Sequence, residues 1–325
     1  MSIRSNVLKI LADGHFHSGT ELGRSLDVTR AAVCKAVKLL SRSGLQIHRV
    51  PGRGYRLEAA FLSLQKELIL RHLDAADQSA VELVILEEVD STNEHLLRRI
   101  TVENSAPVIC LAEAQSAGRG RRGRKWVATP YSNIMLSLSW RFEAGPTVAS
   151  GLSLAAGIAV VRALNEYGIT DLGVKWPNDI VWQEGKLAGL LIDVRGEASG
   201  PSLVVLGLGV NGYISAEDAA LIDQPWVDLL RICGEACDRN RLAGLLLKHL
   251  LRMFQVFERE GLEAFRQEWE NLHAFSGKRV RLRRESEETA GIVRGIDKHG
   301  ALLVEDPHGN LRAFYSGEIS VRLAT

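Results

Sequence analysis

The chain has 325 residues, of which 46% are hydrophobic and 24% are charged, and its formal net charge at pH 7 is +1. This composition excludes a disordered chain and a polycation, and the length allows two or three domains. No apolar run approaches the ~20 residues that span a bilayer, and the first residues lack the apolar core of a signal peptide. Four scattered cysteines do not make a disulfide framework. We therefore expect a cytoplasmic protein with reduced thiols and no membrane segment.

Positive charge is concentrated in residues 1–60, which carry ten Lys or Arg and four acidic residues. The apolar spacing predicts a first helix around residues 7–11, and Ser18 and Glu21 have the spacing of a capping box that opens a second helix. A third helix is expected to start at Thr29 and to end at Gly44. Residues 47–57 then predict two short strands around a Pro-Gly turn.

Two helices joined by a tight turn and followed by a hairpin predict a winged helix-turn-helix over residues 1–62. The alternative is a three-helix packing module with a solvated basic face, but the hairpin and the local charge of +6 favour DNA binding. The side chains expected to contact DNA are Thr29, Arg30, Lys35, Lys38 and Arg53.

The rest of the chain predicts two further domains, so the expected fold class is α+β and multidomain. After a helical linker over 61–78, residues 81–272 alternate strands and helices, which is typical of a mixed α/β domain, and we place the limits of this domain at 63–273. The expected strands are 81–89, 107–114, 133–142, 173–182, 186–194 and 203–211, and the expected long helices are 147–168, 242–260 and 261–272. Short strands separated by turn residues predict a small SH3-like β-barrel over 274–325.

The stretch AGRGRRGRKW, residues 117–126, places three glycines and five cations in ten positions. Glycine lets a backbone approach a ligand closely, and arginine offers a planar donor fork for phosphate. The stretch matches neither the dinucleotide-binding fingerprint nor the P-loop pattern. A flexible nucleic-acid-binding loop is the alternative, but Trp126 and a strand follow directly, which favours an anchored loop that binds a phosphate-bearing small molecule.

Further polar residues lie on turns of the same domain. Lys175 and Lys186, with the neighbouring Asn178 and Asp179, have the side chains needed to hold a triphosphate and its magnesium ion.

Taken together, the motifs of this chain resemble those of biotin protein ligases. The segments that carry the resemblance are DSTN (90–93), GRGRRGRKW (118–126), KWPND (175–179), KLAG (186–189) and GLGVN (207–211). The N-terminal residues resemble the winged helix of the bifunctional members, which are also biotin operon repressors, and GEISVRL (317–323) is similar to the family's C-terminal barrel. The resemblance implies a central domain of the class II synthetase-like type.

The resemblance also implies a two-step reaction. The carboxylate of biotin attacks the α-phosphate of ATP, with Mg²⁺, to give biotinyl-5′-AMP, and a lysine of the biotin carboxyl carrier protein then attacks this mixed anhydride. It implies a second activity as well, in which biotinyl-5′-AMP acts as corepressor at operator DNA. We expect this ligand to favour a homodimer, because one winged helix reads few base pairs.

Site residues follow from the resemblance by motif. Biotin is expected to contact Ser91, Thr92, Asn93, Gln115, Arg119, Gly120, Arg121 and Lys186. ATP is expected to contact Arg121, Arg124, Trp126, Lys175, Asn178 and Asn211. Lys186 and Arg121 are the expected catalytic residues, and Asp179 is the expected magnesium ligand.

Two other functions remain open at this point. A ligand-sensing DNA-binding repressor without ligase activity would not need Lys186 together with Asn178 and Asp179. A lipoate-type ligase shares the related catalytic fold, but the winged helix and the Arg-Gly loop argue against it.

Overall fold

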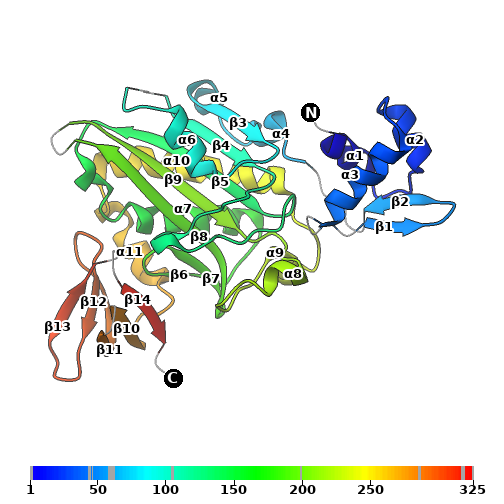
Figure 1. Ribbon diagram of the computed structural model, residues 1–325. Coiled ribbons are helices and arrows are strands. Elements are labelled where there is room, and N and C mark those ends of the chain that lie inside the picture. Colours follow the sequence, from blue (N-terminus) through cyan, green and yellow to red (C-terminus); the bar gives the residue numbers. More distant parts are fainter. Residues whose placement is uncertain are drawn as a thin grey trace.

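The computed structural model describes residues 3–42, 45, 47–57, 63–103, 106–197, 200–284, 287–315 and 319–323. Figure 1 shows an N-terminal helical part, a central domain built on a large sheet, and a small C-terminal sheet on another side of that domain. This arrangement confirms the three-part fold class expected from the sequence. No helix within the described residues combines the length and the apolar character needed to cross a membrane.

The N-terminal part is a helix-turn-helix followed by a hairpin. Its elements are α1 (Ile3–Leu11), α2 (Gly19–Ser25), α3 (Arg30–Arg42), β1 (Ile47–Val50) and β2 (Gly54–Leu57). The predicted capping box is present, because the Ser18 side chain accepts from Glu21 N and the Glu21 carboxylate accepts from Ser18 N. Thr29 Oγ1 accepts from Ala32 N at 3.2 Å, which confirms Thr29 as the N-cap of α3. Gly44, the expected end of this helix, lies outside the described residues.

This part has its own core but touches the central domain. The predicted apolar stripes are buried, at Val7, Leu8, Leu11, Leu22, Val33, Val37 and Leu40. Tyr131 of the central domain is buried in the same cluster, and the Arg4 guanidinium lies 3.2 Å from the Glu88 carboxylate. The winged helix is therefore docked on the chain segments that precede and follow β4 (Val108–Ala112).

The central domain is a seven-stranded sheet in the order β3-β4-β5-β9-β8-β7-β6. The strands are β3 (Glu82–Leu86), β4, β5 (Ile134–Phe142), β6 (Leu172–Lys175), β7 (Asp179–Trp182), β8 (Gly185–Gly196) and β9 (Ser202–Val210). Only β3 and β4 run parallel to each other; all other pairs are antiparallel. The segment 173–182, expected as one strand, is a hairpin of β6 and β7, because Pro177 cannot donate to a strand ladder and Asn178 forms the turn.

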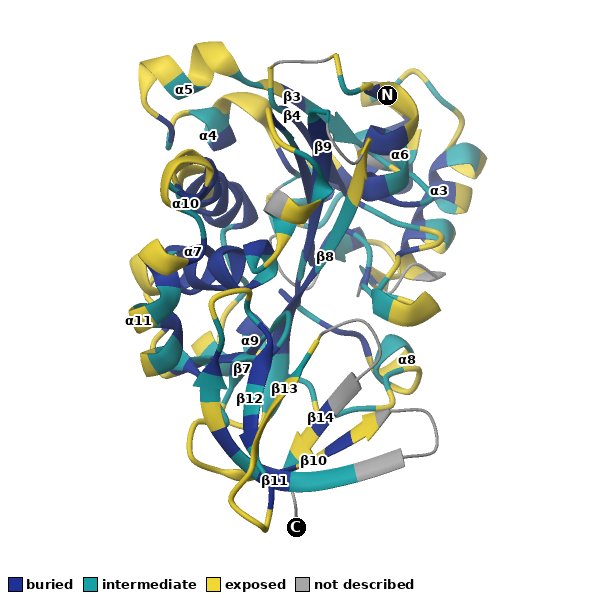
Figure 2. Ribbon diagram, turned by 90° about the vertical axis from the view of Figure 1, so that its left-hand side faces the viewer, coloured by how far each residue is buried: buried dark blue, intermediate teal, exposed yellow. Residues whose placement is uncertain are grey.

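Helices cover the two faces of the sheet unequally. On one face lie α7 (Leu152–Tyr167) and α10 (Arg239–Glu260), which pack on each other and on the main core. Figure 2 shows α10 exposed along its outer side and buried along its inner side. On the opposite face, α6 (Thr92–Arg99) packs on β4, β5 and β9 through a separate apolar cluster. Since α6 is short, much of this second face stays open to a ligand.

The remaining helices are short or lead to the C-terminal sheet. They are α4 (Lys66–Leu70), α5 (Ala75–Ala80), α8 (Ala216–Ala219), α9 (Leu229–Cys233) and α11 (Glu263–Leu272), with 3-10 turns at Arg121–Gly123 and Pro146–Ala149. The expected linker 61–78 thus contains two separate helices, and the helix expected from 147 begins at Leu152, after the Pro146 turn and Gly151.

The C-terminal part is a five-stranded antiparallel sheet in the order β13-β12-β11-β10-β14. Its strands are β10 (Arg279–Arg284), β11 (Glu287–Ile296), β12 (Leu302–Glu305), β13 (Leu311–Phe314) and β14 (Ile319–Leu323). Its inner side chains, such as Val280 and Leu302, belong to the same core cluster as the central domain. Trp176 Nε1 also donates to Gly300 O at 3.0 Å. This sheet is therefore held firmly against the β6–β7 hairpin.

Candidate functional site

A cavity of about 520 Å³ lies on the face of the central sheet that α7 and α10 leave open. Val204, Leu206 and Leu208 of β9 point into the core beneath those helices. Gly207 and Gly209, which alternate with them, face the cavity instead. Thirteen of the fourteen residues predicted to bind biotin, ATP or magnesium line it: Ser91, Thr92, Asn93, Gln115, Arg119, Gly120, Arg121, Arg124, Trp126, Lys175, Asn178, Asp179 and Lys186.

Gly207 and Gly209 of β9 leave room for two side chains that pack directly against the strand. A Cβ atom at Gly207 would stand 2.2 Å from Asn93 Oδ1, and one at Gly209 would stand 2.3 Å from Trp126 Cε2. Any larger residue would displace these two side chains from the cavity floor. The motif around Gly207 and Gly209 therefore shapes the site by letting Asn93 and Trp126 approach the strand.

One end of the cavity is a buried hydrogen-bonded network, which we call the amide end (Thr92, Asn93, Gln115, Ser137 and Asp193). The backbone N and Oγ1 of Thr92 both donate to Gln115 Oε1, at 2.7 and 3.1 Å. Ser137 Oγ lies 2.7 Å from Thr92 Oγ1 and 2.5 Å from Asn93 Oδ1. Asn93 Nδ2 donates to Asp193 Oδ2 at 2.9 Å. Because these groups hold one another, their orientation is set before any ligand arrives.

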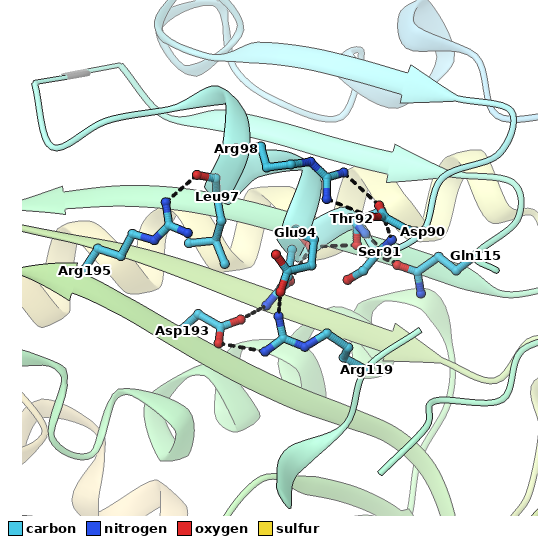
Figure 3. A network of polar contacts seen from close by, with 12 residues as sticks. Asp90, Ser91, Thr92, Glu94, Leu97, Arg98, Gln115, Arg119, Asp193 and Arg195 are labelled. Atoms are coloured by element: carbon cyan, nitrogen blue, oxygen red, sulfur yellow. Dashed lines mark hydrogen bonds and ion pairs between the residues drawn. The ribbon is translucent and has the colours of Figure 1, made fainter. Parts of the chain in front are cut away.

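The network stands at the start of α6, as Figure 3 shows for Thr92 and Gln115. Ser91 is the N-cap of this helix, and its backbone N donates to Asp90 Oδ1 at 2.7 Å. Arg98 forms a two-pronged ion pair with Asp90, at 2.7 and 2.9 Å. Hydrogen bonds from Arg98 and the Ser91 amide lower the pKa of Asp90 to about 2, so this carboxylate stays charged. The turn that presents Ser91 and Thr92 is therefore fixed from outside the cavity.

The Arg-Gly stretch is a loop that closes on itself. Gly120 N donates to Arg124 O at 2.7 Å and Trp126 N donates to Gly118 O at 2.9 Å. Arg119 forms ion pairs with Glu94 and Asp193, and Arg121 donates to Asn178 Oδ1 at 3.2 Å. The loop thus reaches both ends of the cavity, with Arg119 at the amide end and Arg121 at the other.

The opposite end, which we call the cationic end, contains Arg121, Arg124, Lys175 and Lys186 together with the carboxylate of Asp179. Lys186 Nζ lies 2.8 Å from Asp179 Oδ1 and 5.4 Å from the centre of the Trp126 ring. Burial lowers the pKa of both Arg121 and Lys175. An anion placed here would relieve the cost of burying these cations, so this end suits a phosphate chain.

Asn211 is the fourteenth residue predicted to bind biotin, ATP or magnesium, and it does not line the cavity. Its Nδ2 donates to Lys186 O at 3.1 Å and to Val227 O at 3.0 Å. The Lys186 backbone also pairs with Pro225 and Val227. Asn211 therefore fixes the strand from which the Lys186 side chain projects.

Asp179 cannot form a metal site alone. No group of three or more His, Cys, Asp or Glu side chains that could hold a metal occurs within the described ranges. Mg²⁺, however, is commonly bound through one or two carboxylates together with substrate phosphates and water. Asp179 at the cationic end fits that pattern only when a phosphate chain supplies the other ligands.

Several residues of the site were not predicted from the sequence. Ser137 and Asp193 complete the amide end, and Asp223, Pro225, Phe275, Lys278 and Arg322 line the cavity from later segments. The first two carry a signal, because each is a polar residue on the ligand-facing side of a mostly apolar strand. The others lie in a loop and in the C-terminal part, where no local pattern marks them.

The residues predicted to contact DNA lie on the surface of the N-terminal part. Thr29, Arg30, Lys35, Lys38 and Arg53 are all exposed, on α3 and at the hairpin turn. The Arg53 guanidinium stands 4.4 Å from the centre of the Phe16 ring, and Arg56 stands 4.9 Å from the same ring. Phe16 therefore holds two basic side chains of the hairpin, Arg53 and Arg56, against the segment before α2.

Comparisons with known proteins point to one family. The profile of the Biotin/lipoate A/B protein ligase family matches residues 85–211, the profile of the Biotin protein ligase C terminal domain matches 275–322, and an HTH domain profile matches 4–56. The chain is 40% identical to "Bifunctional ligase/repressor BirA" of Escherichia coli, over 98% of this chain and 97% of that protein.

Shorter relatives cover less of the chain. "Biotin--[acetyl-CoA-carboxylase] ligase" of Paracoccus denitrificans is 34% identical over 69% of this chain and 95% of its own length. The structure of "Biotin protein ligase from Aquifex aeolicus in complex with biotin and ATP" superposes with a TM-score of 0.63 at 28% identity, over 75% of this chain and 99% of that chain. These ligases lack a counterpart to a quarter or more of the present chain.

Proposed function

Because this chain belongs to the family of the bifunctional ligase/repressor BirA, we propose that it joins biotin to a protein lysine at the expense of ATP and represses biotin synthesis genes. The observation that carries the ligase half is the cavity itself. It has a preorganised amide end, suited to biotin's ring head, and a cationic end suited to a triphosphate, and one loop contacts both.

In the first step, a carboxylate oxygen of biotin attacks the α-phosphorus of ATP and the bond to pyrophosphate breaks. Negative charge approaches negative charge, so the barrier falls when fixed cations face the reacting oxygens. We assign this role to Lys186 and Arg121. Lys186 Nζ lies 2.8 Å from Asp179 Oδ1, so the reacting oxygens would compete with that carboxylate for the ammonium group.

Thr92, Asn93 and Gln115 are proposed to hydrogen-bond the ring head, with Ser91 and Gly120 beside them. Arg124, Lys175 and Asn178 are proposed to bind the phosphates, and Trp126 to contact adenine. The indole supports this assignment, since Trp126 Nε1 is buried and has no hydrogen-bond partner in the described parts of the chain. Mg²⁺ would be held by Asp179 together with the phosphates, and it would neutralise charge on them.

In the second step, a lysine amine of the biotin carboxyl carrier protein attacks the carbonyl carbon of biotinyl-5′-AMP. The bond to the phosphate oxygen breaks, AMP leaves and the amine loses a proton. Closing the 118–126 loop over the anhydride would keep water away from it between the two steps. We propose that the protein acts in the cytoplasm, as expected from the sequence.

For the repressor half, we propose that α3 and the hairpin tip contact operator DNA through Thr29, Arg30, Lys35, Lys38 and Arg53. Biotinyl-5′-AMP accumulates when no carrier lysine is available, so it is a suitable corepressor. By ordering residues around the 118–126 loop, it would favour a homodimer that presents two winged helices, and dimerisation would tighten adenylate binding by the same factor.

The ligase activity is tested by mixing the protein with ATP and either biotin or lipoate and measuring pyrophosphate. We expect release with biotin only. Release with lipoate only would identify a lipoate-type ligase, and release with neither would leave a sensing repressor.

The repressor half is tested separately on the full chain. We expect Lys35→Glu with Lys38→Glu to abolish operator binding and to leave pyrophosphate release unchanged. Sedimentation with and without biotinyl-5′-AMP tests the dimer, and equal self-association in both states would contradict it. The proposed domain limits, 1–62, 63–273 and 274–325, are tested by mapping the sites of limited proteolysis.

A further inference from the structure

Asp193 of β8 connects two parts of the site that are far apart in the sequence. Its Oδ2 accepts from Asn93 Nδ2 at 2.9 Å, and its Oδ1 lies 3.2 Å from Arg119 of the loop. Figure 3 shows the Arg119 guanidinium between the carboxylates of Asp193 and Glu94, which come from β8 and α6. The Asp193 carboxylate therefore contacts both Asn93 of the amide end and Arg119 of the loop that covers this end.

A carboxylate is needed for this double contact. Its two oxygens accept from two donors at once, whereas the amide of asparagine has one acceptor oxygen. An amide at position 193 would therefore have to turn its NH₂ group toward either Asn93 Nδ2 or Arg119, both of which are donors. The Asp193 side chain is 23% exposed, so water replaces a lost partner only in part.

The contact also fixes which way Asn93 faces. With its Nδ2 held by Asp193, Asn93 turns Oδ1 to Ser137 Oγ, 2.5 Å away. Without that anchor the amide is free to rotate, and its donor and acceptor exchange places in front of the ligand.

Arg119 is engaged by two acids, which separates its role from that of Arg121. Its charge is balanced by Glu94 and Asp193, so the triad carries a net charge of −1 and does not attract phosphate. Arg119 therefore serves to tie the loop to α6 and β8, and the phosphate-binding cations lie at the other end of the cavity.

We propose that Asp193 is a positioning residue that couples the ring-head site to closure of the 118–126 loop, and that Glu94 supports only the closure. This inference rests on the proposed ligase function, because it names what holds biotin and biotinyl-5′-AMP in that site. It assigns to Asp193 an effect on both biotin affinity and adenylate retention, and to Glu94 an effect on retention alone.

The test compares Asp193→Asn and Glu94→Gln in the full chain. Biotin affinity is measured by calorimetry without ATP. Retention is measured by forming labelled biotinyl-5′-AMP on the protein and following its release. We expect Asp193→Asn to weaken biotin binding about tenfold, the effect of a lost hydrogen bond to a charged group, and to speed release by a similar factor. We expect Glu94→Gln to speed release about two- to fivefold and to leave biotin affinity unchanged.

The matched control is Glu82→Gln. Glu82 forms an ion pair with Arg99 at the far end of α6, away from the cavity, and its loss should change neither quantity. Salt gives a second readout that a merely structural role would not move. Because salt screens the exposed Arg119–Glu94 pair, it should speed release more in the wild type than in Glu94→Gln.

The outcomes separate the two proposals. Wild-type affinity and release in Asp193→Asn would overturn the coupling, as would a loss of biotin affinity in Glu94→Gln equal to that in Asp193→Asn. If Asp193→Asn fails to fold, Arg119→Gln takes its place. Arg119 and Glu94 are 38% and 35% exposed, so their variants should fold, and wild-type release in both would also overturn the proposal. If the wild type makes no adenylate, the proposed function fails instead.

Discussion

The two ends of the cavity differ in how their polar side chains are stabilised. At the amide end, side chains satisfy one another, and the buried Ser137 is held by Thr92 and Asn93. At the cationic end, four basic side chains lie in the same part of the cavity as the carboxylate of Asp179. The first arrangement costs little because its polar groups are paired. The second holds partly buried positive charge that a bound anion would stabilise.

This difference implies a division of labour. A preorganised hydrogen-bonded network selects a ligand by shape and hydrogen bonding, and it acts equally on the ground state and the transition state. Cations that wait for negative charge act most strongly where charge builds up, so they lower the reaction barrier. Substitutions at the amide end should therefore change biotin affinity, and substitutions at the cationic end should change rates. Three substitutions test this division, and a fourth experiment tests a buried group next to the cationic end; they follow in order of decreasing expected effect.

The largest effect is expected from Lys186→Ala. Losing a preorganised cation at the reacting oxygens should cost about 3–4 kcal/mol in the transition state, or roughly 10²–10³-fold in the rate of biotinyl-5′-AMP formation. Biotin affinity measured without ATP should change much less. Pre-steady-state pyrophosphate release gives the rate and calorimetry gives the affinity. Loss of affinity equal to the loss of rate would remove the distinction between the two ends.

Acid pH should lower the free energy of unfolding through His273, a buried residue next to the cationic end. His273 is 6% exposed, stacks on Trp269 at 4.3 Å, and pairs through its backbone with Val174, next to Lys175. Burial lowers its pKa to about 4 from 6.5. Between these values the unfolded chain binds more protons than the folded chain, so stability falls as pH falls. From pH 7 to pH 4 the wild type should lose about 3 kcal/mol more than His273→Phe.

Urea unfolding of both proteins at several pH values checks this prediction. The phenylalanine preserves the stacking on Trp269 but does not titrate, so other acidic and basic groups cancel in the comparison. Parallel stability curves for the two proteins would show that His273 is not the group responsible.

Arg121→Gly should leave adenylate formation possible but speed its release. The Arg121 guanidinium contacts Asn178 and belongs to the loop. If it binds the phosphate as proposed, its removal takes away a charged hydrogen bond, which corresponds to about tenfold or more in release. Freed biotinyl-5′-AMP would then label bystander lysines, measured on added serum albumin. Arg121→Lys, which keeps the charge without the planar fork, should give an intermediate result. Unlabelled albumin alongside normal labelling of the carrier would exclude Arg121 from the loop clamp.

The sequence predicts the site residues that lie in local motifs better than the residues that reach the cavity through tertiary packing. Local motifs identify Thr92, Arg121 and Lys186, because each lies in a short segment of characteristic spacing, and capping chemistry predicts the starts of α2 and α3. Phe275 and Arg322 could not be predicted, because they reach the cavity only through packing of the C-terminal sheet against the β6–β7 hairpin.

Strand register accounts for other differences. Asp193 and Ser137 come together at Asn93 because β8 and β5 both pair with β9 in a register that aligns them near Gly207. Such long-range pairing is not contained in either strand alone. Asn211 shows the converse, since a residue within a recognisable motif supports the backbone beside the cavity and does not face the ligand.

The smallest effect, and the sharpest test of the amide end, is expected from Ser137→Ala. Ser137 is fully buried behind the cavity lining, and its hydroxyl lies within hydrogen-bond distance of both Thr92 Oγ1 and Asn93 Oδ1. Removing it leaves both groups less well satisfied and should lower the free energy of unfolding by about 1–3 kcal/mol. Because the orientation of Asn93 then loosens, biotin affinity should fall roughly fivefold to tenfold, which is the effect of one neutral hydrogen bond. At saturating biotin, the rate of adenylate formation should stay within about twofold of the wild type, since no charge at the reacting oxygens has changed.

Ser139→Ala is the matched control, because Ser139 is buried two residues along the same strand and, among the described residues, bonds only to the backbone of Val108. It should lower stability by a similar amount without changing biotin affinity. A fall in the saturated rate of Ser137→Ala as large as its fall in affinity would mean that the amide end also takes part in the chemical step, and the division between the two ends would not hold.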